Sequence, residues 1–163
     1  MNDKQIEKLA SMLDPSLWKN PLGAIKTLLQ HQGKIFDPRK LSHVILRGGT
    51  ELTKDDKKKA GINPNAKTGS AALSCFTDDG LKDCVDLAFE LALAIATIDE
   101  SLDKQQRWKR QNVKRLIFAP APDCCDSCKK LEKEYPVDKA PIPVLDTHLG
   151  CRCSYTMGAN CFD

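Results

Sequence analysis

The chain has 163 residues, of which 29% are charged, and its formal net charge is +3. This length allows one domain with a hydrophobic core, or a helical body with a small metal-stabilised module. So small a positive charge does not indicate nucleic-acid binding unless the cations are clustered. The opening residues, MNDKQIEKLASMLD, lack the pattern of a signal peptide, so we expect a protein made and kept in a reducing cytosol.

Helix-capping signals divide the first sixty residues into short helices. Asp14-Pro15, Asn20-Pro21 and Asp37-Pro38 each place a capping side chain before a proline, the preferred order at a helix start. Thr53 and Asp56 resemble a capping box. The predicted helices cover residues 3–13, 21–31, 38–47 and 53–60. Residues 61–80 are rich in turn formers, which predicts a long ordered loop or extended segment.

The strongest predicted helix runs from Leu81 to about Arg110, because this segment contains neither proline nor glycine. Between Cys84 and Ile98 its apolar residues nearly encircle the helix, so we expect it to be the central and most buried one. The uninterrupted apolar stretch is shorter than the roughly 20 residues that span a membrane, and no transmembrane segment is expected.

The composition changes near residue 112. Residues 113–119, VKRLIFA, form a short apolar run that predicts a strand. The remainder is poor in apolar residues and rich in proline, so a bound metal would have to supply stability that a core cannot. The predicted fold class is therefore mainly α, with a helical body at 1–112 and a zinc-stabilised module with short strands at 113–163.

Two cysteine clusters in this module have the spacing of metal ligands. Cys125 and Cys128 form a C-x-x-C pair, and His148 begins an H-x-x-C-x-C segment. Zinc prefers four thiolate or imidazole ligands in a tetrahedron, and two short clusters can supply two each. The predicted ligands are Cys125, Cys128, Cys151 and Cys153, with Cys124 and His148 as alternates. His148 can instead support a ligand by hydrogen bonding, and a disulfide pair or buried free thiols remain the alternatives to a metal.

A cluster of cations precedes the module. It contains a tryptophan and no acidic residue, and it comprises Arg107, Trp108, Lys109, Arg110, Lys114 and Arg115. Such a cluster can meet phosphates or an acidic protein surface. A solvated helix end, whose cations favour the negative end of the helix dipole, explains the same residues.

Residues 125–155 resemble the C-terminal signature of phage head-morphogenesis proteins of the Mu F-like minor capsid group. The shared features are the C-x-x-C pair, a leucine, an aromatic-proline step, further prolines and the H-x-x-C-x-C ending. In this sequence they are Cys125, Cys128, Leu131, Tyr135, Pro136, Pro141, Pro143, His148, Cys151, Arg152 and Cys153. The resemblance implies a zinc-holding module in a virion component near the portal and the capsid interior.

Two functions of different classes are therefore expected. The first is a structural or assembly protein of a phage or prophage particle, a minor head or connector-type component made in the host cytoplasm and incorporated into the virion. It would form homo-oligomers and contact portal, capsid or neck proteins. The second is a zinc-ribbon-like regulator that binds nucleic acid, with Trp108 or Tyr155 stacking on a base. No nucleophile lies beside a base and no phosphate-binding glycine loop is present, so we do not expect an enzyme.

Overall fold

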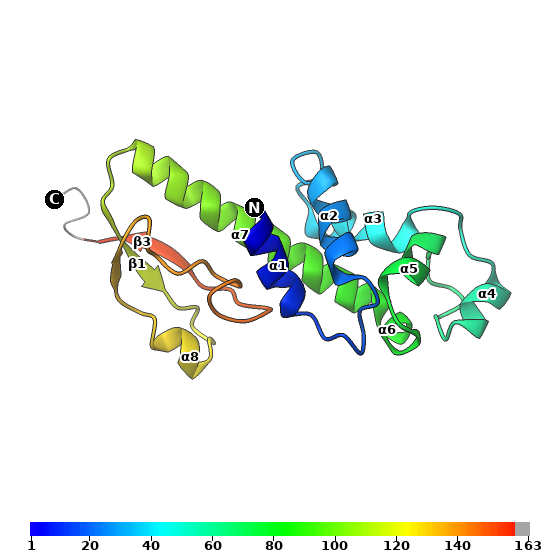
Figure 1. Cartoon of the computed structure of the whole chain (residues 1–163). Coiled ribbons are helices and arrows are strands. Elements are labelled where there is room, and N and C mark those ends of the chain that lie inside the picture. The colour runs from blue at the N-terminus through cyan, green and yellow to red at the C-terminus, as the bar shows by residue number, and fades with distance from the viewer. Residues whose placement is uncertain (159–163) are drawn as a thin grey trace. The chain divides into compact units, whose positions relative to one another are not determined.

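The computed structural model describes residues 1–158 and divides the chain into two compact units, one formed by Met1–Ala96 and one that begins at Thr97. The first unit contains six helices and the start of a seventh, long helix. These helices are α1 (Asp3–Ser11), α2 (Pro21–His31), α3 (Pro38–Arg47), α4 (Lys54–Lys59), α5 (Ser70–Cys75), α6 (Asp78–Lys82) and α7 (Cys84–Arg110) (Figure 1). The prediction of a mainly helical body with one long helix is confirmed.

Three of the predicted helix starts have the capping geometry that the sequence indicates. The Asn20 side chain accepts a hydrogen bond from the Gly23 N–H, Asp37 accepts one from Arg39, and Thr53 forms a capping box with Asp56. No helix begins at Asp14-Pro15. The Asp14 carboxylate accepts the Ser16 N–H in a short turn instead.

The prediction of a loop over residues 61–80 is wrong for its second half, which forms α5 and α6. Tertiary contacts favour these short helices over the turn-forming sequence. Trp18 pairs with Phe76 in an isolated bridge, their rings 4.5 Å apart, and the Thr77 N–H donates to the Leu17 carbonyl. Gly80 is required there, because a Cβ at this position would lie 2.0 Å from the Leu17 oxygen.

The core of the first unit joins α1, α2, α3, α5 and the first half of α7. Leu9, Ile25, Ile45, Phe76 and Ile95 are among its fully buried side chains. Helix α7 is expected to be the central and most buried helix. Ala88, Leu91 and Ile95 are buried, whereas Val85 is 50% exposed, so α7 is buried along one broad face and not around its whole circumference.

The second unit combines the last turns of α7 with a small antiparallel sheet and a one-turn helix. Strand β1 (Arg115–Ala119) lies between β2 (Glu134–Pro136) and β3 (Ser154–Met157), and α8 (Asp126–Lys129) follows β1. Leu116 and Phe118 alternate inward along β1 and are fully buried. The expected short strands are thus present at the C-terminal end.

This unit begins at Thr97, before the boundary that the composition indicates near residue 112. The reason lies in the end of α7. The Gln105 side-chain amide donates to the Ala140 carbonyl and to the Tyr155 hydroxyl, and the Trp108 ring meets the Tyr155 ring edge-on at 6.5 Å. Side chains from the last turns of α7 therefore pack against one side of the core of the second unit. Within residues 1–158, no helix has both the length and the hydropathy for a membrane crossing.

Candidate metal centre

The sheet register brings the two cysteine clusters together. Ala119, the last residue of β1, pairs with Ser154, the first residue of β3. In an antiparallel pair, the chain that leaves one strand runs beside the chain that enters the other. The segment that leads to Cys125 and Cys128 therefore lies beside the segment that contains Cys151 and Cys153.

Five side chains can hold a metal ion, in two groups that share Cys128. The ligand atoms of Cys125, Cys128 and His148 all lie within 4.8 Å of one another, and so do those of Cys128, Cys151 and Cys153. The Cys128 sulfur is 3.4 Å from His148 Nε2 and 3.9 Å from the Cys151 sulfur. Since Zn–S bonds are about 2.3 Å long, the edges of a zinc tetrahedron are about 3.5 to 3.8 Å. These separations therefore match zinc coordination closely.

His148 is oriented as a metal ligand. Its Nδ1 lies 2.6 Å from the Leu149 carbonyl oxygen, which can only accept, so Nδ1 carries the proton of this hydrogen bond. Nε2 faces the Cys128 sulfur and, in the neutral ring, presents a lone pair. Ligating histidines in metalloproteins are held in this way, with the second ring nitrogen bonded to a carbonyl or carboxylate. Of the two predicted alternates, His148 joins the cluster, and Cys124 belongs to neither group.

Backbone N–H groups favour the thiolate form at the first cysteine of each cluster. The Cys128 N–H lowers the pKa of Cys125 to about 7, assisted by the Ser127 N–H. Burial raises the pKa of Cys151, but hydrogen bonds from Thr147 and from the Cys153 N–H outweigh it, so its pKa is lowered overall. Burial raises the pKa of Cys128 and Cys153. Zinc binds thiolates, so ligation of the buried thiols requires that the metal displace their protons.

A strained backbone position supports the second cluster. Val144 has φ +71°, although it is β-branched and fully buried, and such residues rarely adopt the left-handed conformation. In this conformation its N–H donates to the Thr147 hydroxyl and contributes to the lowered pKa of Cys151. Strain of this kind persists where surrounding contacts hold it, often at functional sites. Sequence reasoning missed Thr147 and Val144, since nothing in the segment VLDTH indicates that the Thr147 hydroxyl and the Val144 N–H turn toward a cysteine.

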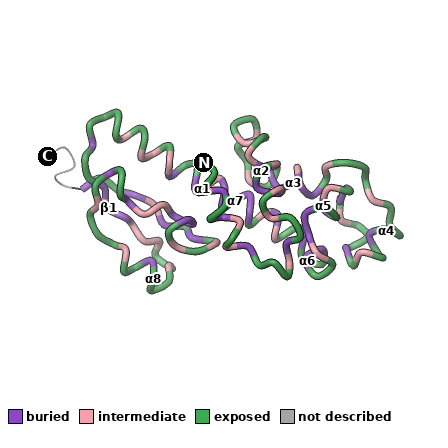
Figure 2. Tube along the Cα trace, in the orientation of Figure 1, coloured by how far each residue is buried: buried purple, intermediate pink, exposed green. Residues whose placement is uncertain are grey.

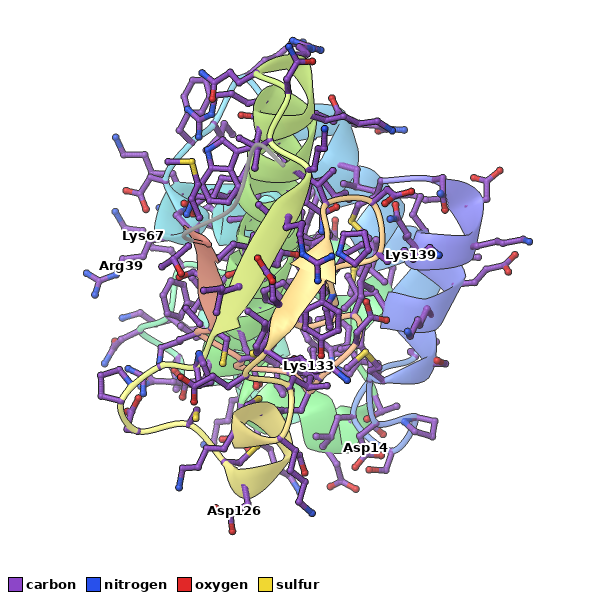
Figure 3. The ribbon with its side chains drawn as sticks, turned by 90° about the vertical axis from the view of Figure 1, so that its left-hand side faces the viewer. Asp14, Arg39, Lys67, Asp126, Lys133 and Lys139 are labelled. Atoms are coloured by element: carbon purple, nitrogen blue, oxygen red, sulfur yellow. The ribbon has the colours of Figure 1, made fainter. Side chains whose placement is uncertain are left out.

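The ends of the two clusters are also joined at the surface. The Arg152 guanidinium, between Cys151 and Cys153, pairs with the Asp123 carboxylate beside the first cluster. Lys129 and Asp126 form a second surface ion pair along α8. Figure 3 shows Asp126 at the outer side of α8, pointing away from the strands. Exposed pairs of this kind add little stability, so the burial of Cys128, Cys151 and Cys153 matters more.

All seven cysteines in the described part of the chain are free thiols, and Cys161 lies outside it. Cys75 and Cys84 are buried in the first unit, apart from the metal cluster, where Cys84 acts as the small core residue that the sequence predicts. The two clusters, not these distant cysteines, form the candidate site.

The predicted cation cluster lies at the end of α7 and in the turn that follows. Arg107, Lys109, Arg110 and Lys114 are exposed, and Arg115 begins β1, where it pairs with Glu134 at 3.0 Å. Trp108 is half-buried against Tyr155, and Tyr155 itself is only 5% exposed. Tyr155 is therefore too buried to stack on a base, whereas stacking by Trp108, part of which is exposed, stays a prediction.

Comparisons with protein-family models, with curated proteins and with solved structures found no match to this chain.

Proposed function

We propose that this protein is a structural component of a phage or prophage particle, a minor head or connector-type protein, whose C-terminal module is fastened by one zinc ion. The observation that carries the proposal is the meeting of five ligand atoms from two distant clusters. These same residues carry the resemblance to the Mu F-like signature. The helical unit would contact neighbouring subunits and other virion proteins of the portal, capsid or neck.

The ligand set favours a structural role for the metal over a catalytic one. Catalytic zinc keeps one coordination position for water, whereas structural zinc is closed by four protein ligands. Five residues are candidate ligands, one more than a tetrahedral zinc ion needs, and Cys128, Cys151 and Cys153 are buried. Cys128, Cys151 and two of the remaining three residues would hold the ion with no position left open for water.

The primary test combines metal content with solution mass. Protein purified under reducing conditions is expected to contain about one zinc ion per chain and to form a closed oligomer by light scattering. Zinc in a strictly monomeric protein that does not bind particles would contradict the assembly role but retain the structural zinc. A metal-free protein with all cluster thiols reactive would contradict the zinc centre.

Single substitutions then identify the ligands. Cobalt(II) in place of zinc reports the number of bound thiolates through its sulfur-to-metal charge-transfer absorption. We expect Cys128→Ser and Cys151→Ser to weaken metal binding most, because their sulfurs lie at tetrahedral-edge distance. Cys124→Ser is the matched control, since it changes an adjacent cysteine outside both groups. An unaltered cobalt spectrum in His148→Ala would assign His148 a supporting role.

A further inference from the structure

The end of α7 and the turn that leads to β1 carry an accumulation of positive charge that the candidate metal centre does not explain. Three exposed cations in the last turn of the helix, Arg107, Lys109 and Arg110, are joined by Lys114 just before β1, and these four residues are here called the cationic turn. Figure 2 shows this segment as mostly exposed. Within residues 1–158 none of the four forms an ion pair, whereas Arg115, Lys129 and Arg152 in the same unit each have an acidic partner.

Most of the helix end is capped without the cations. Backbone N–H groups satisfy three of the last four carbonyls of α7: Gln111 donates to Arg107 and Trp108, Asn112 to Lys109, and Val113 to Trp108. The helix dipole favours cations in the last turn, but Lys114 lies beyond the end of the helix. Charge repulsion among four unpaired cations costs stability unless an anion relieves it.

An open pocket of about 560 Å³ lies in the same place. Lys109, Asn112 and Lys114 line it together with Val113, Val137 and Asp138. Asn112 adopts φ +58°, a left-handed conformation that asparagine tolerates, and this places the residue at the pocket wall. Two lysines and an asparagine thus border a space that is accessible from solvent. Among residues 1–158, Asp138 is the one acidic residue in its lining.

The residues of this surface indicate which polyanion it would bind, an acidic protein or a nucleic acid. Interfaces with proteins depend on buried aromatic or aliphatic anchors, but Val113 and Val137 are only 2% and 7% exposed, and Trp108 is packed on Tyr155. Because these apolar side chains are largely buried, the exposed charged and polar groups of this surface are mainly cations and an amide, which are groups that contact phosphates. We propose that the cationic turn and its pocket bind the phosphodiester backbone of nucleic acid, without reading the base sequence.

This inference goes beyond the assembly role and does not depend on it. Binding would be measured on the full-length zinc-loaded protein by fluorescence anisotropy with two mixed-sequence DNA duplexes of unrelated sequence. Four phosphate contacts predict a slope of log K against log salt of about −3 to −4, which is roughly a hundredfold loss between about 50 and 200 mM salt. The two duplexes should bind within about twofold of each other, because phosphate contacts carry no sequence information.

The decisive variant is the double substitution Lys109→Gln with Lys114→Gln. It should weaken binding by about tenfold or more and flatten the slope by about 2. Lys54→Gln with Lys58→Gln is the matched control, because it removes the same charge from exposed positions of α4 in the other unit. Asp138→Asn should strengthen binding several-fold. Zinc content and circular dichroism of each variant verify that the module remains folded.

Three results would overturn the proposal: no DNA binding at low salt, equal weakening in both double variants, or a marked preference for one duplex sequence. Poly-glutamate serves as a competitor of the same charge. If it displaces DNA as effectively as unlabelled DNA does, the surface belongs to an acidic protein partner and the nucleic-acid assignment is wrong.

Discussion

The two units achieve order by different means. Most of the largest fully buried side chains belong to the helical unit, where Leu9, Ile25, Leu41 and Ile95 join several helices. The second unit has one short three-stranded sheet, a four-residue helix and long proline-containing connections. Its centre includes three buried thiols where a larger domain would place aliphatic side chains. Small modules of this kind are commonly stabilised by a disulfide or a bound metal, and the candidate metal site lies in this unit.

Removal of the proposed zinc ion should have the largest effect on this difference between the two units. Cys128→Ser, or treatment with a strong chelator, should release zinc and make residues 120–158 sensitive to protease. Structural zinc contributes on the order of 10 kcal/mol in small metal-dependent folds, so the module should lose its fold while the helical unit retains its helices. Limited proteolysis with mass spectrometry and far-UV circular dichroism measure both effects. Unchanged protease resistance in Cys128→Ser would contradict a structural metal.

The converse experiment weakens the helical unit alone. Ile25→Ala truncates a fully buried side chain of α2 and should lower the free energy of unfolding of this unit by about 2–5 kcal/mol. Chemical denaturation monitored by helical circular dichroism measures the loss. Zinc content should not change, and the exposed neighbour Lys26→Ala is the control. Loss of zinc from Ile25→Ala would show that the two units do not fold independently.

A smaller effect tests how much of the module's stability lies outside the metal centre. The Tyr155 hydroxyl accepts a hydrogen bond from Gln105 at 2.9 Å and donates one to the Pro141 carbonyl at 2.8 Å. Tyr155→Phe removes both bonds while it keeps the ring, and should cost about 1–2 kcal/mol. Thermal unfolding of the zinc-loaded protein, followed by near-UV circular dichroism, detects this change. An unaltered melting temperature would mean that the metal alone determines the module's stability.

The smallest effect concerns a helix cap in the first unit. Asn20→Ala removes the side-chain acceptor of the Gly23 N–H, 2.9 Å away, and should destabilise the helical unit by about 1 kcal/mol. Asn20→Asp, which restores an acceptor, should recover most of the loss in the same denaturation experiment. Failure of aspartate to rescue the variant would assign the effect to something other than the cap.

The sequence by itself determined most helix positions and indicated which residues form the candidate metal site. Caps at Asn20, Asp37 and Thr53 act through neighbours within three positions, so local sequence is enough to place them. The spacing of C-x-x-C and H-x-x-C-x-C likewise restricts which atoms can share one ion. Helices over residues 70–82 were not predictable, because contacts of Trp18 and Leu17 with Phe76 and Thr77 stabilise them across more than fifty positions.

Only the tertiary structure decided how the ligands are arranged and where the second unit begins. Pairing of Ala119 with Ser154 sets the two clusters side by side, and the Leu149 carbonyl orients His148 toward them. The end of α7 joins the module because Gln105 and Trp108 meet Tyr155, fifty and forty-seven positions further along the chain. Such contacts depend on strand register and side-chain direction. The spacing of residues along the sequence predicts neither the register nor the side-chain direction, because the packing of distant segments determines both.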